Sequence, residues 1–121
     1  KVKDDYMGEN ELSNRLFKFS IEIIKMLRSL KGGNDISIIA VQLSKSANPA
    51  GNYEEAQGAV SRPDFASKIG IALKESREAN YWLRILSELY PKDQELKRLT
   101  AESNELKKIL GSISYKVSPR T

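Results

Sequence analysis

The amino-acid sequence predicts an all-α protein of one domain: an up-down-up-down four-helix bundle of long antiparallel helices with a kinked second helix. Three observations lead to this prediction. Apolar residues recur at intervals of three and four in four successive segments, the spacing of one helix face. Stretches rich in Gly, Pro, Asn and Asp separate these segments. Only one segment could be a strand, and no second strand candidate exists to pair with it. A strand without a partner would leave its backbone N–H and C=O groups unsatisfied.

The first helix is expected over residues 9–31. One stripe of its surface holds the apolar residues Leu12, Leu16, Phe19, Ile23, Met26, Leu27 and Leu30. Gly32 and Gly33 follow, and we expect them to adopt the left-handed conformation that ends many helices. Residues 1–8, before the helix, are expected to be frayed.

The second helix is expected over residues 35–58, although its sequence is ambiguous. The stretch "ISIIAVQL" at 36–43 is rich in β-branched residues and would suit a buried strand. Because no partner strand exists, we predict a helix that is buried on more than one side. Pro49 falls inside this segment, so we expect it to remove one backbone hydrogen bond and to kink the helix.

The third and fourth helices are expected over residues 63–90 and 92–116, with the heptad spacing of helices that cross at about 20°. Pro63 suits a first helical turn, and Ser61 or Asp64 can cap it. The third-helix seam is Phe65, Ile69, Ala72, Ser76, Ala79, Leu83, Leu86 and Tyr90. The fourth-helix seam is Leu96, Leu99, Ser103, Leu106, Leu110, Ile113 and Val117. Residues 117–121 are expected to be frayed.

Four large side chains, Tyr81, Trp82, Ile85 and Leu89, lie beside the third-helix seam rather than on it. Two interpretations stay open. The four residues either widen the core stripe of this helix or form a surface for self-association, since contiguous exposed apolar side chains usually mark a contact.

Composition bounds the possible chemistry. The 121 residues are 40% hydrophobic and 30% charged, enough apolar surface for a core and too much charge for a membrane protein. The absence of Cys and His removes disulfides, thiolate nucleophiles, imidazole bases and nearly all transition-metal sites. We therefore expect no metal and no cofactor. The first residues lack the apolar stretch of a signal peptide, so we expect a cytoplasmic protein.

No motif predicts catalysis. Glu54 and Glu55 are adjacent and point to different sides of a helix, so they cannot act as acid and base on one substrate. The stretch "KGGND" at 31–35 lacks the length and the Gly-Lys-Ser/Thr ending of a phosphate-binding loop. We expect no enzyme activity and no catalytic residue.

Twenty basic and sixteen acidic residues give a net charge of +4, which permits binding to polyanions without requiring it. On a helical wheel, four basic residues of the first helix lie opposite its apolar stripe, and four of the last helix gather around one direction. These residues are Arg15, Lys18, Lys25 and Arg28, then Lys97, Arg98, Lys107 and Lys108. Each group is either a solvated face or a nucleic-acid-binding surface that an oligomer would repeat around its axis.

Residues 51–86 resemble the signature region of a known family. The matching segments are Asn52, Tyr53, Glu55, Ala56 and Gln57, then Pro63, Asp64 and Phe65, then 71–75 and 81–83. They resemble the four-helix-bundle proteins encoded in intervening sequences of bacterial 23S ribosomal RNA genes. The resemblance is close over this region and loose elsewhere, and it implies that the second helix continues through the motif.

Asn52 and Glu55 of this motif lie three residues apart and share a helix face. They could form a polar cluster with Lys74, Glu75 or Arg84. Such a cluster either fixes the register of the helices or binds a ligand, and Tyr53 belongs to the same motif. Both interpretations stay open.

The resemblance also implies partners. Relatives form ring-like homopentamers, and a related group serves as the basic accessory subunit of reverse transcriptases in diversity-generating retroelements. We therefore expect a non-enzymatic homo-oligomer, of five copies, that binds structured RNA or other nucleic acid through basic faces. The alternative is an oligomeric adaptor for protein–protein interaction, of the reverse-transcriptase accessory type, with no direct nucleic-acid role. Neither function involves a membrane.

Overall fold

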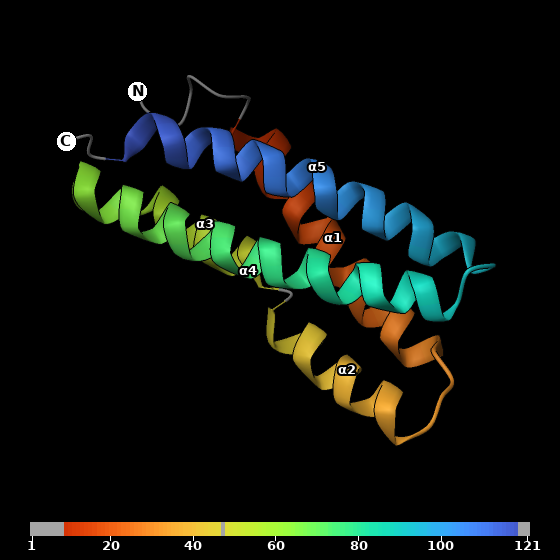
Figure 1. Cartoon of the computed structure of the whole chain (residues 1–121). Coiled ribbons are helices and arrows are strands. Elements are labelled where there is room, and N and C mark those ends of the chain that lie inside the picture. Colours follow the sequence, from red (N-terminus) through yellow and green to blue (C-terminus); the bar gives the residue numbers. More distant parts are fainter. Residues whose placement is uncertain (1–8, 47, 119–121) are drawn as a thin grey trace.

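The structure, a computed structural model, describes residues 9–46 and 48–118, without the side chains of residues 9 and 10. Those ranges contain five helices and no strand. The helices are α1 (Glu9–Ser29), α2 (Asn34–Ser46), α3 (Pro49–Gln57), α4 (Arg62–Leu89) and α5 (Gln94–Val117). Because α2 and α3 follow one another along one side of the molecule, they form the second of four antiparallel rods (Figure 1). The predicted bundle and the bend in its second rod are confirmed.

The bend lies where α2 ends and α3 begins. Pro49 is the first residue of α3, a position where a helix has a free N–H in any case. It therefore removes no intrahelical hydrogen bond, and the expected loss of one is wrong. Asn48, just before it, has a non-helical backbone with φ of −125° and ψ of 33°.

The turn between α1 and α2 is tight because Gly32 has no side chain. A Cβ atom there would lie 2.7 Å from Ile36 Cβ and 2.7 Å from Tyr90 Oη. The Tyr90 hydroxyl instead donates a hydrogen bond to the carbonyl oxygen of Lys31, 2.5 Å away. No described glycine has a positive φ, so the expected left-handed conformation of Gly32 and Gly33 is wrong. Gly32 serves close approach rather than an unusual backbone angle.

Side chains cap the two long helices. Ser61 Oγ accepts a hydrogen bond from the backbone N–H of Asp64 at 3.1 Å, and Asp93 Oδ1 accepts one from Leu96 at 3.1 Å. The Asp64 carboxylate in turn accepts from Lys68 Nζ at 2.6 Å and from the N–H of Val60 at 3.1 Å. These two bonds, that of Lys68 above all, lower the pKa of Asp64. The caps fix where α4 and α5 begin and hence how they align.

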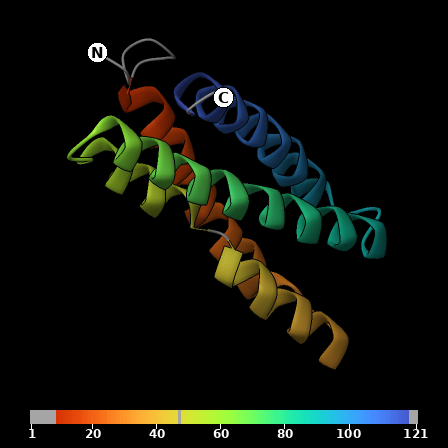
Figure 2. The ribbon, with the colours of Figure 1, turned by 60° about the vertical axis from the view of Figure 1, so that its left-hand side comes forward.

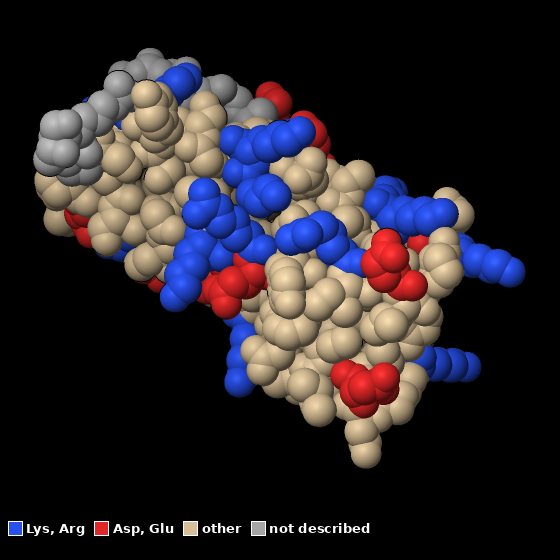
Figure 3. Space-filling model, viewed as in Figure 1, with Lys and Arg blue, Asp and Glu red and all other residues tan. Residues whose placement is uncertain are grey.

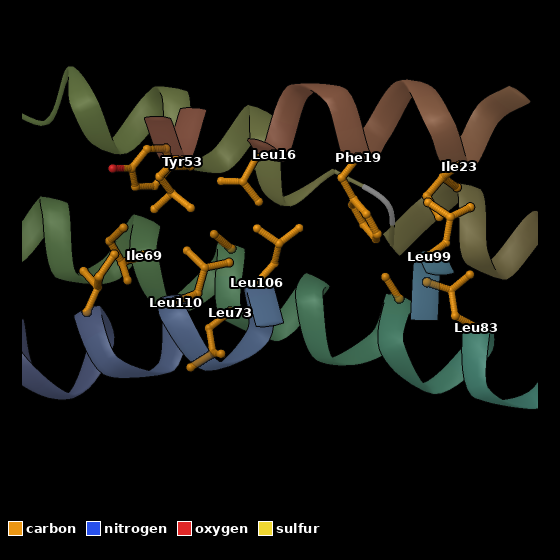
Figure 4. Close-up of a cluster of buried hydrophobic side chains, with 14 of the residues drawn as sticks. Leu16, Phe19, Ile23, Tyr53, Ile69, Leu73, Leu83, Leu99, Leu106 and Leu110 are labelled. Carbon is orange, nitrogen blue, oxygen red and sulfur yellow. The ribbon is translucent and has the colours of Figure 1, made fainter. Parts of the chain in front are cut away.

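The core consists of the predicted seams. All seam residues of α5 are buried. Of the third-helix seam, the residues within α4 are buried, and Tyr90, which follows the last residue of α4, is partly buried. Figure 4 shows side chains of α1 meeting those of α4 and α5. Its labelled residues are Leu16, Phe19 and Ile23 of α1, Tyr53 of α3, Ile69, Leu73 and Leu83 of α4, and Leu99, Leu106 and Leu110 of α5. Heptad spacing in sequence therefore located most of the core.

Helix α2 lies at the edge of the molecule in two views (Figures 1 and 2). Among its side chains only Leu43 and Ser46 are buried. Ile38 and Val41 lie on its outer side and are 63% and 50% exposed. The expectation that this segment is buried on more than one side is wrong for the single chain.

The ends of the chain were expected to be frayed. Residues 1–8 and 119–121 lie outside the described residues, whereas Val117 is buried and ends α5. Across residues 9–46 and 48–118, no helix combines the length and the apolar character that crossing a membrane requires.

Candidate functional site

A groove runs between α4 and α5 on the face shown in Figure 3, where Lys and Arg gather across the middle of the surface. One hollow of about 520 Å³ is lined by Leu73, Arg77, Asn80, Arg84, Lys107, Lys108 and Gly111. A second hollow of about 480 Å³ shares Asn80 and Arg84 with the first. It adds Ser87, Lys97, Thr100, Ala101 and Asn104. We call the two hollows together the basic groove.

Helix geometry brings these cations together. Arg77, Asn80 and Arg84 are spaced by three and four residues on α4, so they share the side that faces α5. The lysines come from the facing side of α5, which runs antiparallel. The hydroxyl groups of Ser87 and Thr100 lie 2.8 Å apart and fix the alignment at one end of the groove. Five cations from two helices therefore border one concave surface.

Asn80 forms the floor of the basic groove. Its side chain is 2% exposed, and its Oδ1 accepts hydrogen bonds from Arg84 Nε at 3.1 Å and from Lys107 Nζ at 3.3 Å. A buried amide needs such partners. Because the acceptor is neutral, Asn80 orients both cations without cancelling their charge.

Among the described residues, most of these cations form no ion pair with a carboxylate. Among the described residues, no ion pair includes Arg77, Arg84, Lys97 or Lys107. Lys108 lies 3.8 Å from Glu105, but both side chains are well exposed, so water screens this contact strongly. The positive charge of the groove is therefore available to an anion. Elsewhere in the described part of the chain, no three acidic side chains gather to hold a metal ion.

Comparisons with known proteins agree with this architecture. The family described as 23S rRNA-intervening sequence protein matches residues 8–112. The chain belongs to this family. The chain is also similar to a protein of unknown function from the S23 ribosomal protein family of Bacteroides thetaiotaomicron VPI-5482, whose crystal structure is known. The two share 30% sequence identity and a TM-score of 0.77, over 90% of this chain and 99% of that one. No curated protein matches.

The eight basic residues predicted to bind nucleic acid lie in three places on the molecule. Lys97, Lys107 and Lys108 border the basic groove. Lys18, Lys25 and Arg28 are exposed on the outer face of α1. Arg15 and Arg98 lie between α1 and α5.

Arg15 and Arg98 are engaged in ion pairs across that boundary. Arg15 donates to both carboxylate oxygens of Glu102, at 3.1 and 2.7 Å. Arg98 pairs with Glu95 at 2.7 Å and with Glu22 of α1 at 3.0 Å. The hydrogen bonds to Glu102 and Glu95 are the main reason that the pKa of each guanidinium group is raised. The expected position of Arg15 opposite the apolar stripe is therefore wrong.

The outer face of α1 holds a second set of apolar side chains that the sequence analysis missed. Phe17, Ile21 and Ile24 are 64%, 38% and 49% exposed. Their spacing of four and three places them on one side of the helix, next to the exposed cations. We call these three residues the α1 outer stripe.

The four side chains considered for self-association do not behave as one surface. Trp82 packs against the core and Ile85 is partly buried. Tyr81 and Leu89 are 50% and 51% exposed. The wider core stripe therefore describes Trp82, while Tyr81 and Leu89 remain on the surface.

Of the polar cluster predicted for the family motif, the structure shows one side-chain contact between α3 and α4. Asn52 Nδ2 donates a hydrogen bond to Glu75 Oε1. Burial raises the pKa of Glu75, and the bond from Asn52 partly opposes the shift. Glu55 and Lys74 are exposed, and Tyr53 is buried in the core.

Arg77 and Asn80 of the groove were absent from every predicted site, and Arg84 was considered only for the polar cluster of the family motif. The signal for them was their spacing beside the third-helix seam, with Arg84 continuing the same line. To use it, one had to know which flank of that helix faces the last one.

Proposed function

We propose that this protein is a non-enzymatic homo-oligomer that binds RNA, or another nucleic acid, through phosphate contacts in the basic groove. The observation that carries the proposal is the groove itself. Five cations from two helices border a concave surface, and a buried neutral amide orients two of them.

Phosphate is the anion that this arrangement fits best. Lys and Arg side chains replace the counterions around the phosphates of a nucleic acid. This contributes affinity that does not depend on the base sequence. Arg adds a planar fork that can bind two phosphate oxygens at once. Arg77 and Arg84 are two turns apart, about 10 Å along α4, so they can contact different phosphates of one backbone.

The exposed apolar faces support assembly from copies of this chain. The α1 outer stripe lies on one helix, and Ile38 with Val41 lies on another. Two different apolar faces fit a head-to-tail contact, which closes into a ring when the rotation between copies allows it. The family resemblance implies a ring of five. Each copy would add its groove to the field around the common axis.

A second candidate function, an oligomeric adaptor for other proteins, is favoured by the same α1 outer stripe. In that case a protein partner covers the stripe, and the positive charge of the groove serves only solubility. Nucleic-acid binding separates the two candidates.

The test is the affinity for a labelled RNA hairpin, measured by fluorescence anisotropy across a salt series. Contacts to four or five phosphates predict a slope of log K against log salt between about −3 and −4.5. The double variant Arg77→Glu, Lys108→Glu should bind on the order of 100-fold more weakly. The matched control Lys18→Glu, Lys25→Glu makes the same change in net charge and should bind within about 3-fold of the unmodified protein.

All four substituted side chains are exposed, so folding should be retained, which circular dichroism checks. Equal losses in the two double variants would mean that the groove is no more a binding site than the rest of the surface. No binding at low salt would leave the adaptor function.

A further inference from the structure

We propose that the basic groove takes a single-stranded segment of RNA, and that one of its unpaired bases stacks on Tyr81. This inference rests on the proposed function and specifies the form of nucleic acid. It starts from an aromatic side chain at the edge of the groove.

Tyr81 borders the groove through Arg84. The guanidinium carbon of Arg84 lies 5.8 Å from the centre of the Tyr81 ring, and the same Arg84 side chain lines both hollows of the groove. Tyr81 as a whole remains 50% exposed. An anion held by Arg84 is therefore within reach of an accessible aromatic surface.

The orientation of Tyr81 is held by its neighbour. Trp82 meets it edge to face, with ring centres 5.1 Å apart and planes at 76°, and Trp82 itself packs against the core. A ring that is already ordered loses little conformational freedom when a base stacks on it. Tyr81 thus differs from an isolated surface tyrosine.

Charge alone does not distinguish the forms of nucleic acid, because every form carries phosphates. An aromatic side chain does distinguish them. Bases inside a duplex stack on each other, whereas unpaired bases can be splayed out onto an aromatic ring or a guanidinium plane. Tyr81 and Arg84 offer one of each: the guanidinium group lies over one face of the ring, and a base can stack on the other face.

The shape of the groove points the same way. It lies between two packed helices, whose axes are typically about 8–10 Å apart, so it is narrow enough to follow one strand. From Leu73 to Ser87 it extends for about 20 Å of helix, room for a short run of nucleotides. A single backbone can therefore run along it beside Tyr81.

The experiment compares an unstructured RNA of about 12 nucleotides with a blunt duplex of the same length, at one salt concentration. The single strand should bind more tightly to the unmodified protein. Tyr81→Ala should weaken single-strand binding by about 10-fold and leave duplex binding within about 2-fold. Tyr81→Phe keeps the ring and should retain the affinity for the single strand.

Tighter binding of the duplex, an unchanged affinity of Tyr81→Ala for the single strand, or an equal loss for both forms would overturn the inference. A drop in solution mass of Tyr81→Ala would also contradict it, because the ring would then belong to a contact between copies. The groove variant Arg77→Glu, Lys108→Glu separates the two levels. If this groove variant binds both RNAs as well as the unmodified protein does, the proposed function fails. If the groove variant does not bind RNA but Tyr81→Ala keeps its affinity for the single strand, only the stacking inference fails.

Discussion

The basic groove and the outer face of α1 both carry cations, but they differ in what lies between those cations. In the groove, a buried amide holds Arg84 and Lys107 in place. On α1, Phe17, Ile21 and Ile24 separate the cations with apolar surface. We therefore expect the neighbours of a charged residue to influence whether a basic face binds phosphate or protein.

Curvature separates the two regions as well. The groove is concave because two helices border it, so several cations can surround one strand of phosphates. The outer face of α1 comes from a single convex helix. Its apolar side chains are better placed to pack against another flat or grooved protein surface than to surround an anion.

The largest expected effect comes from placing charge on the α1 outer stripe. Ile21→Asp with Ile24→Asp should shift the solution mass toward the 13.6 kDa chain, because burying two aspartates in an interface is costly. Sedimentation velocity measures this shift. Val60→Asp, at a 92% exposed position between α3 and α4, is the matched control and should leave the mass unchanged.

If the double variant kept the assembled mass, the α1 outer stripe would not be a contact between copies. Only the basic groove would then keep its proposed role in binding.

A smaller effect is expected from removing the orienting amide of the groove. Asn80→Leu keeps a similar volume but gives Arg84 and Lys107 no acceptor, so RNA affinity should fall by about 5-fold. Fluorescence anisotropy measures it. Ser103→Ala is a useful control, because Ser103 is buried on α5 and its hydroxyl has no hydrogen-bond partner among the described residues.

The control variant should bind RNA like the unmodified protein. An equal affinity for Asn80→Leu would show that Arg84 and Lys107 need no positioning by the floor of the groove.

The smallest effect concerns an arginine that is already paired. Arg15→Met removes the ion pair with Glu102. The two side chains are 34% and 26% exposed, so water screens the pair and its loss should lower the free energy of unfolding by about 0.5 kcal/mol. RNA affinity should stay within about 2-fold. Arg84→Met is the matched comparison. It should weaken RNA binding clearly, whereas the loss of stability in urea denaturation should be small because Lys107 still donates a hydrogen bond to Asn80.

A loss of RNA affinity in Arg15→Met as large as that in Arg84→Met would contradict the distinction between paired and unpaired cations.

Most of the fold was predictable because it depends on spacing along single helices. The seams of α4 and α5 follow from the heptad rhythm, and every seam residue within these two helices is buried. Local conformations were less predictable. Pro49 and Gly32 both marked breaks correctly, but a helix start and a close contact explain them better than a lost hydrogen bond and a left-handed residue.

The candidate site was harder to predict because it depends on pairs of helices. Lys107 and Lys108 were identified from their own helix, but Arg77 and Asn80 gain meaning only from facing α5. Arg15 shows the reverse case, since a wheel for α1 alone cannot reveal Glu102 across the boundary. Contacts between helices, which have no sequence period, determined which cations are available.

Lysine footprinting of the unmodified protein tests the central claim most directly. Acetylation of each lysine is measured by mass spectrometry with and without RNA. If phosphates bind in the basic groove, RNA should protect Lys97, Lys107 and Lys108 and leave Lys18 and Lys25 as reactive as before. Protection of Lys18 and Lys25 with no change at the three groove lysines would contradict the account.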